Sequence, residues 1–144
     1  MDIKIIVLSL FASAVSLTGF AQETVITGKQ IPQEITAYVT RHFPGQKLLQ
    51  VVKDRDDFTV KYEVILDNRT KLEFNSKKQI TEIDGKSKLP DSVIPSKILS
   101  YVKANYPDNY ITDWDLDKRK QSVELDNNLS LEFSRAGTFL RIDD

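Results

Sequence analysis

The chain has 144 residues, of which 40% are hydrophobic and 28% are charged, a balance typical of a folded globular protein. Its net charge is −1, so the composition gives no basic footprint for nucleic acid and no polybasic patch for a membrane surface. The sequence contains no cysteine, which excludes disulfides, thiolate metal sites, a cysteine nucleophile and a lipoprotein anchor.

The first stretch of the chain differs in character from the rest. Residues 3–20 are almost entirely apolar or small, with Lys4 as the only basic residue among them. Gly19-Phe20-Ala21 supplies the small residues that a signal peptidase reads, and a polar segment begins at Gln22. We therefore predict a signal peptide over 1–21, cleaved after Ala21, and a periplasmic or secreted protein without membrane insertion after cleavage. The alternative is a transmembrane anchor, for which this run is barely long enough.

A short polar lead-in, expected to be mobile up to Gly28, precedes a helix pattern that the sequence contains twice. Ile-Pro-x-x-Ile-x-x-Tyr-Val-x-x-x-Phe-Pro at residues 31–44 returns at residues 94–107, with Tyr in place of Phe. The first proline suits the first turn of a helix, the apolar residues fall on one helical face, and the second proline ends the helix. Each half of the chain is thus predicted to begin with one amphipathic helix.

Strand-like segments follow each predicted helix. In the first half, residues 48–52 form a short apolar run, and residues 58–66 alternate apolar and polar side chains, beginning with Phe58 on the apolar face. A third strand carries Leu72 and Phe74, and a fourth, with Ile80 and Ile83, is expected to contain a bulge because the spacing of its apolar residues is odd. In the second half the strands recur at 110–117, 121–126, 129–133 and 138–143.

The duplication predicts an α+β fold of two tandem repeats, each with one helix packed on about four antiparallel strands. The Leu-Asp-Asn and Leu-Glu-Phe sequences that occur in both halves support the same alignment. We place the first repeat at residues 22–86 and the second at residues 87–144. The helices should cover one face of the sheet and leave the other face free.

The two helix patterns ending in Phe-Pro or Tyr-Pro, each followed by four strands with Leu-Glu-Phe in the third, resemble the PepSY-like family. The resemblance covers residues 31–142 and implies a β-lactamase-inhibitor-like fold and an envelope or secreted location, in a family common in Bacteroidetes. It also implies a protein that is not an enzyme, has no cofactor and binds another protein or peptide. The partner would be an unknown envelope or secreted protein. Inhibition of an envelope hydrolase is one form that this binding could take.

Catalytic and metal sites have weak support in the residues. His42 is the only histidine, and Asn105 takes its place in the second repeat, so a structural role is favoured over a catalytic one. The alternation Asp113-x-Asp115-x-Asp117 is the one candidate for calcium binding, since hard cations take clustered carboxylates. Alternation along a strand explains these aspartates as a polar strand face, and this interpretation is favoured, because Lys118-Arg119-Lys120 follows where a calcium loop needs a glycine. Calcium or small-ligand binding is therefore the alternative to protein binding.

Three residues are candidates for the binding surface. Lys61 and Glu63 lie on the polar side of the clearest predicted strand, which should face away from the helices. Trp114 is the only tryptophan, and tryptophan is enriched where proteins bind each other. Its alternation with the aspartates also fits a place in the core, and the sequence favours that place.

Overall fold

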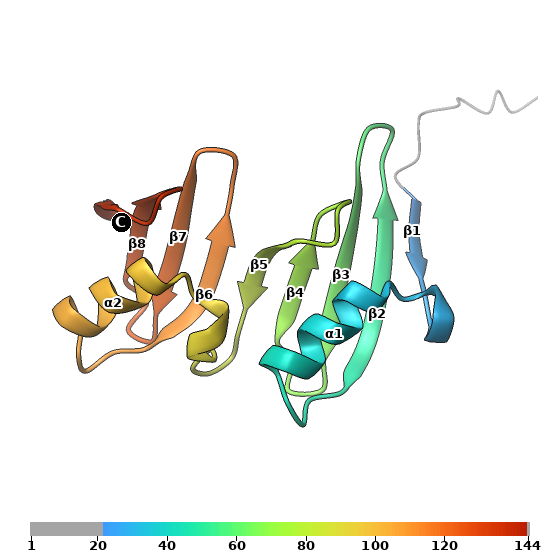
Figure 1. The fold of residues 1–144 in the computed structure, drawn as a ribbon, viewed down its shortest axis with the longest axis horizontal. Helices are drawn as coiled ribbons and strands as arrows, with labels where there is room; N and C mark the ends of the chain where they lie inside the picture. Colours follow the sequence, from blue (N-terminus) through green and yellow to red (C-terminus); the bar gives the residue numbers. More distant parts are fainter. Residues whose placement is uncertain (1–21, 144) are drawn as a thin grey trace, which may run out of the picture.

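The protein is described by a computed structural model that covers residues 22–143, so the signal peptide predicted for 1–21 lies outside the described residues. Nine strands form one antiparallel sheet in which every strand pairs with its neighbours in the sequence. Both helices lie on the same side of this sheet, and β1 and the C-terminus lie at its opposite ends (Figure 1). Within the described range, no helix is long and apolar enough to cross a membrane.

The predicted α+β fold of two tandem repeats is confirmed, and the repeats share one sheet. The first repeat consists of α1 (Gln33–His42), β2 (Leu48–Arg55), β3 (Val60–Leu66), β4 (Lys71–Phe74) and β5 (Ile80–Asp84). The second consists of α2 (Ser96–Asn105), β6 (Ile111–Leu116), β7 (Lys120–Leu125), β8 (Ser130–Ser134) and β9 (Phe139–Asp143). Strand β1 (Gln22–Val25) and two short 3-10 helices, η1 (Gly28–Gln30) and η2 (Asp91–Val93), precede the helices.

The two helices begin and end in the same way. Pro32 and Pro95 occupy the position just before the first helical residue, where a missing N–H has no helical partner to lose. Each helix ends just before the aromatic residue that precedes the second proline of the pattern, because a residue before proline is disfavoured in the helical conformation. The apolar faces of both helices are buried against the sheet.

The core has the same aromatic contact in both repeats. Tyr38 of α1 meets Phe74 of β4 edge to face with ring centres 5.4 Å apart, and Tyr101 of α2 meets Phe133 of β8 in the same way at 5.4 Å. Both phenylalanines are fully buried. Each helix is therefore fastened to the third strand of its own repeat by an equivalent ring pair.

The first strand of the second repeat pairs directly with the last strand of the first. In this β5–β6 pairing, Ile83 lies opposite Trp114 on the helix side, and both side chains are buried. The bulge predicted for the fourth strand is confirmed, since the β4–β5 register shifts between Glu73 and Phe74. The β8–β9 register shifts at the equivalent place.

The lead-in is not mobile as predicted, because Gln22–Val25 forms β1 and pairs with the outer edge of β2. This pairing uses the far end of β2, which runs on to Arg55 rather than ending near Val52 as the apolar run suggested. Ile26 then enters the core. The apolar pair Val25-Ile26 was the only signal for this strand in an otherwise polar segment.

The predicted position of Phe58 on the inner face of a strand is also wrong. Its side chain is 95% exposed at the tip of the β2–β3 hairpin. The Asp56 carboxylate accepts hydrogen bonds from the backbone N–H groups of Phe58 and Thr59 at 2.9 and 2.7 Å, which extends the turn through Thr59. Strand β3 therefore begins only at Val60.

We expect Phe74→Ala and Phe133→Ala each to lower the free energy of unfolding by about 3–5 kcal/mol, because each leaves a cavity under a helix. Since the repeats share a sheet and a core, each variant should still unfold in a single transition, monitored by circular dichroism and by Trp114 fluorescence in urea. Two separate transitions in either variant would show that the repeats unfold independently.

Candidate functional site

The sheet surface opposite the two helices, here called the open face, is lined by charged side chains. In a strand, successive side chains point to opposite sides, so the apolar residues of β3, β4, β7 and β8 face the helices and their polar neighbours form the open face. Lys61 and Glu63 lie on this face, as the alternation predicted. Their role in binding stays a prediction.

Four carboxylates stand directly opposite one another in a row across the middle of the open face. Glu63 pairs with Glu73, Glu73 with Glu82, and Glu82 with Asp115, so that the row crosses four strands from β3 to β6. Like charges directly opposite on neighbouring strands destabilise a sheet. This row therefore needs cations nearby.

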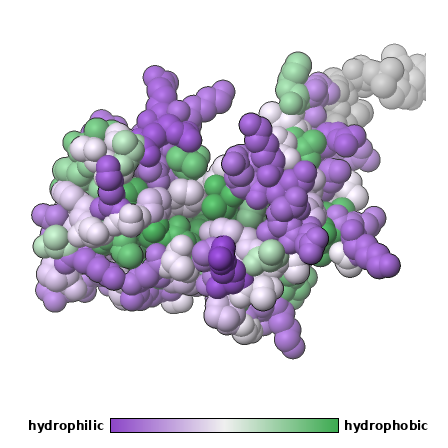
Figure 2. Space-filling model, in the orientation of Figure 1, coloured by the Kyte–Doolittle hydropathy of each residue, from purple (hydrophilic) through white to green (hydrophobic). Residues whose placement is uncertain are grey.

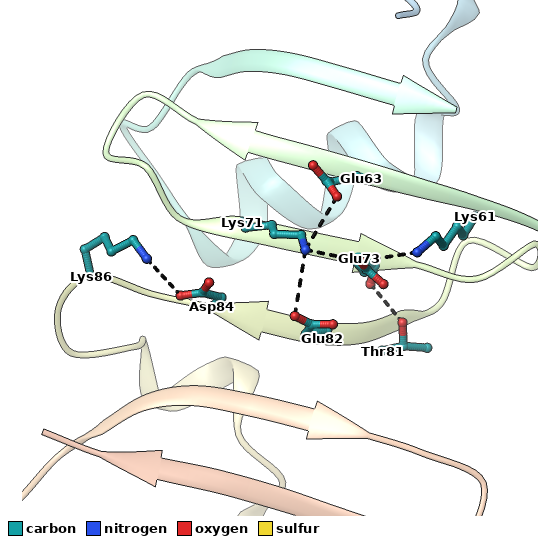
Figure 3. A network of polar contacts seen from close by, with 8 residues as sticks. All are labelled: Lys61, Glu63, Lys71, Glu73, Thr81, Glu82, Asp84 and Lys86. Carbon is teal, nitrogen blue, oxygen red and sulfur yellow. Dashed lines mark hydrogen bonds and ion pairs between the residues drawn. The ribbon is translucent and has the colours of Figure 1, made fainter. Parts of the chain in front are cut away.

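Lys71 supplies the cation for the first three carboxylates of the row (Figure 3). Its Nζ lies 3.5 Å from Glu63, 3.3 Å from Glu73 and 4.0 Å from Glu82. Burial lowers the pKa of Lys71, but the three carboxylates outweigh this effect and raise it overall. Lys61 adds a second contact to Glu73 at 3.6 Å. The lysine contacts of the row thus lie on its three first-repeat members.

The second repeat has its own ion cluster around Glu132. This carboxylate is almost fully buried and accepts hydrogen bonds from Lys120 Nζ and from Arg141 Nε, the latter at 2.7 Å. The hydrogen bonds from Arg141 and Lys120 lower the pKa of Glu132 from 4.5 to about 2. The cluster fixes β7, β8 and β9 to one another on the open face.

Between these two clusters lies a group of acidic residues that we call the carboxylate seam: Glu82, Asp84, Asp113, Asp115 and Glu124. It follows the β5–β6 pairing, where Glu82 lies opposite Asp115 and Asp84 lies opposite Asp113. The seam lines a hollow of about 330 Å³ at the junction of the two repeats.

Cations reach the seam only at its edge. Lys71 contacts Glu82 at 4.0 Å, and Lys86 contacts Asp84 at 3.2 Å. No lysine or arginine of residues 22–143 comes within 4.0 Å of the other three seam carboxylates, Asp113, Asp115 and Glu124. The seam therefore carries uncompensated negative charge.

Burial first, and neighbouring carboxylates second, raise the pKa of three seam residues. The pKa of Asp113 is raised by burial and by Asp84, although a hydrogen bond from the Thr112 hydroxyl opposes the shift. The pKa of Asp115 is raised by burial, with Asp117 and Glu73 adding to the shift and Lys120 opposing it. The pKa of Glu82 is likewise raised by burial and by Glu73. Ionising the seam thus costs free energy that an approaching cation would recover.

Trp114 does not belong to the open face. Its side chain is 5% exposed on the helix side of the sheet, in the core position that the sequence favoured. Its Nε1–H donates to Oε1 of the buried Gln121 at 3.1 Å, and Gln121 in turn donates to the Arg135 carbonyl at 3.0 Å. Trp114 therefore supports the strand that carries Asp113 and Asp115 from behind.

The three aspartates of the candidate calcium site do not come together. Asp113 and Asp115 lie on the open face, whereas the Asp117 carboxylate accepts hydrogen bonds from the N–H groups of Arg119 and Lys120 in the β6–β7 turn, at 2.6 and 3.0 Å. These bonds lower the pKa of Asp117. In the part of the chain that the structure describes, no three His, Asp or Glu side chains are arranged to hold a metal ion.

His42 joins the two repeats on the helix side. Its Nδ1 lies 2.9 Å from the Ser92 hydroxyl of η2, and its ring packs on Tyr38 with centres 4.5 Å apart. Burial and the nearby Arg41 lower its pKa. Within residues 22–143 no carboxylate hydrogen-bonds the ring, so the pair lacks the group that orients the histidine in a catalytic triad.

The comparisons with known proteins agree with this architecture. A family model described as "Putative beta-lactamase-inhibitor-like, PepSY-like" matches residues 20–61 and 60–141. The chain belongs to the PepSY-like family. Its two matched segments cover nearly all of the described residues, whereas no curated protein matches the chain.

Three solved structures resemble this PepSY-like protein, each with a TM-score of 0.79 over 85% of the chain. One is a "putative periplasmic protein" of the DUF2874 family from Bacteroides vulgatus, 33% identical and covered to 97%. The second, a "putative calcium-regulated periplasmic protein" from Bacteroides thetaiotaomicron, is 32% identical and covered to 97%. The third, a "putative periplasmic protein of unknown function" from B. vulgatus, is 31% identical and covered to 100%.

We expect Glu132→Gln to lower the melting temperature at pH 7 by several degrees. The folded-state pKa of Glu132, about 2, is below its ordinary value of 4.5, so its ionised form stabilises the fold above pH 4.5. That contribution is lost as the pH falls from 4.5 through 2. The difference in melting temperature between wild type and variant should therefore shrink over this range in calorimetry. A difference independent of pH would contradict the ionic role of Glu132, and Glu34→Gln on α1 serves as the control.

For the seam residue Asp113 we expect the opposite change in melting temperature. The folded-state pKa of Asp113 is raised, so its ionised form destabilises the fold at neutral pH and protonation removes this cost as the pH falls toward the ordinary value of 3.8. Asp113→Asn should raise the melting temperature at pH 7 by about 1–3 °C, the effect of relieving one like-charge pair. The gain should vanish in acid. Asp57→Asn at the hairpin tip is the matched control; an equal gain there would remove the seam as the cause.

Proposed function

We propose that this protein is a non-catalytic binding module that holds a lysine- or arginine-rich segment of another envelope protein on its open face. The proposal rests chiefly on the carboxylate seam, in which Glu82 opposes Asp115 and Asp84 opposes Asp113. Within residues 22–143, lysines contact only the β5 member of each pair, and no lysine or arginine lies within 4.0 Å of Asp113 or Asp115. Such pairs weaken the joint between the repeats, so a stabilising contact elsewhere or a ligand must offset them.

Charge complementarity favours a basic segment as the occupant. Ammonium or guanidinium groups in the hollow would form charge-assisted hydrogen bonds with Asp113, Asp115 and Glu124, which are free of lysine and arginine contacts within 4.0 Å in the described residues. The cations of Lys71 and Lys120 lie on either side of the seam. They would disfavour cations elsewhere on the open face and so align the segment along the seam.

The envelope location and the absence of catalysis have separate support. The predicted signal peptide would direct the chain out of the cytoplasm, and three similar structures are described as periplasmic proteins. The family is described as inhibitor-like, which fits a protein that acts by binding. Inhibition of an envelope hydrolase would be one outcome of such binding.

Calcium is the competing ligand, because one of the similar structures is described as calcium-regulated. Calcium prefers six to eight oxygen ligands at 2.3–2.6 Å, roughly, from a site that closes around the ion. The seam is an open hollow, and in residues 22–143 no three of its side chains are arranged around one point for a metal. Several positive charges spaced along a peptide therefore fit the carboxylates of the seam better than a single calcium ion does.

The test uses a defined probe, a ten-residue peptide in which lysine alternates with serine, added to residues 22–144. We expect binding that quenches or shifts the fluorescence of Trp114, which lies on β6 behind the seam, and that weakens as salt is added. The triple variant Glu82→Gln, Asp113→Asn and Asp115→Asn should weaken the affinity about tenfold or more, because it removes three of the five seam charges.

The matched control is Glu34→Gln, Asp57→Asn and Asp108→Asn, which changes the net charge equally but leaves the seam intact. If this variant loses as much affinity as the seam variant, binding reflects overall charge and the proposal fails. Calcium without peptide forms the second arm. Two results together would make calcium the ligand in place of a basic segment. Calorimetry would show micromolar calcium binding that the seam variant loses, and the peptide would not bind.

A further inference from the structure

The last strand of each repeat holds the same position within its repeat. β5 pairs with β4 through Phe74–Ile80, Glu73–Glu82 and Leu72–Ile83, and β9 pairs with β8 through Phe133–Phe139, Glu132–Arg141 and Leu131–Ile142. The bulge falls at the same step in both pairings. Residue by residue, β9 is therefore the counterpart of β5, and Ile142 is the counterpart of Ile83.

The outer edges of these two equivalent strands differ in what covers them. The edge of β5 is paired with β6, and Ile83 is fully buried opposite Trp114. The edge of β9 ends the sheet, close to the C-terminus in Figure 1, and Ile142 is 44% exposed. A strand that paired with β9 as β6 pairs with β5 would bury Ile142 and satisfy the row of open backbone groups.

We propose that the occupant of this edge is a second copy of the chain, whose β9 pairs antiparallel with the first about a two-fold axis at Ile142. The two sheets would then form one continuous sheet across the dimer. This interface is distinct from the open face, so the proposal does not depend on what the open face binds.

The side chains of β9 are complementary to themselves in this arrangement. With Ile142 opposite Ile142 of the second copy, Arg141 lies opposite Asp143 of the second copy, and the same pair forms again on the other side of the axis. Arg141 and Asp143 share one face of β9, because they are two residues apart, and their side chains already lie 3.6 Å apart within one copy. Directly opposed charges of opposite sign stabilise antiparallel pairing.

The other end of the sheet fits this edge less well. β1 (Gln22–Val25) has the acidic Glu23 and no basic residue, so it offers no partner for Asp143. Pairing β9 with β1 of another copy would also leave a free edge on each new copy and build an open chain of molecules. Two-fold pairing closes after two copies, which is the commonest symmetry of soluble oligomers.

The association should be weak, because an axis at Ile142 pairs only residues 141–143 of the two β9 strands and so buries less than the roughly 1,200 Å² of a standard stable interface. Sedimentation velocity on residues 22–144, which contain the whole sheet and both helices, should therefore span about 5 µM to 1 mM, the range where such an interface is populated. We expect a monomer–dimer equilibrium without larger species. A monomer throughout this range would overturn the proposal.

Two substitutions test the interface itself. Ile142→Lys places two ammonium groups against each other on the axis, and Asp143→Arg places arginine opposite Arg141. Both positions are exposed in the single copy, so both variants should fold, as circular dichroism would check, and remain monomeric up to 1 mM, roughly. Val25→Lys, at the opposite edge and similarly exposed, should dimerise as wild type does. Loss of association in Val25→Lys instead would point to head-to-tail pairing and overturn the two-fold dimer.

A covalent test is available because the chain has no cysteine. In Ile142→Cys the two new thiols would face each other across the axis, about 4.5–5.5 Å apart at Cβ, which a small adjustment brings within disulfide range. Mild oxidation should give a covalent dimer at least about tenfold faster than Val25→Cys, since pairing raises the effective concentration. Equal rates in the two variants would contradict the arrangement.

Discussion

The architecture depends on the pairing of β5 with β6, where the strands of the two repeats join into one sheet in the described range 22–143. On the helix side this pairing brings Ile83 against Trp114 and makes the two cores continuous. On the open face the same register brings Glu82 against Asp115 and Asp84 against Asp113. Because side chains alternate in a strand, the apolar contact and the acidic pairs cannot be separated. The joint is thus stabilised on one side and strained on the other.

On the open face, cations balance the carboxylates on either side of this pairing. Lys71 serves three carboxylates in the first repeat, and Lys120 and Arg141 serve the buried Glu132 in the second. Within residues 22–143, neither cation group comes within 4.0 Å of Asp113, Asp115 or Glu124. The uncompensated charge is therefore confined to the junction between the repeats, where neither repeat alone would have a site.

The sequence predicted the elements well and the site only in part, for physical reasons. The helical repeat and the alternation within strands report burial directly, so both helices and eight of the nine strands could be placed from them. Strand β1 could not be predicted, because an edge strand needs few apolar residues. The seam is not readable from the sequence because it depends on strand register: Asp113 and Asp115 follow from alternation, but their partners Glu82 and Asp84 come from the other repeat. Spacing alone groups Asp117 with these two aspartates, but its carboxylate accepts backbone hydrogen bonds in the β6–β7 turn.

Duplication explains why the joint and the free edge have related chemistry. Strands β5 and β9 descend from the same position, but at the bulge-adjacent pair the first repeat has Glu82 opposite Glu73, whereas the second has Arg141 opposite Glu132. In the second repeat, Arg141 therefore pairs with Glu132 directly across the strands. In the first repeat, the equivalent position is a like-charge pair that depends on Lys71. The same exchange gives β9 a basic residue two positions before an acidic one, where β5 has two acids, Glu82 and Asp84. A β5 edge could not pair with its own copy without opposing acids; a β9 edge can, because its charges alternate in sign.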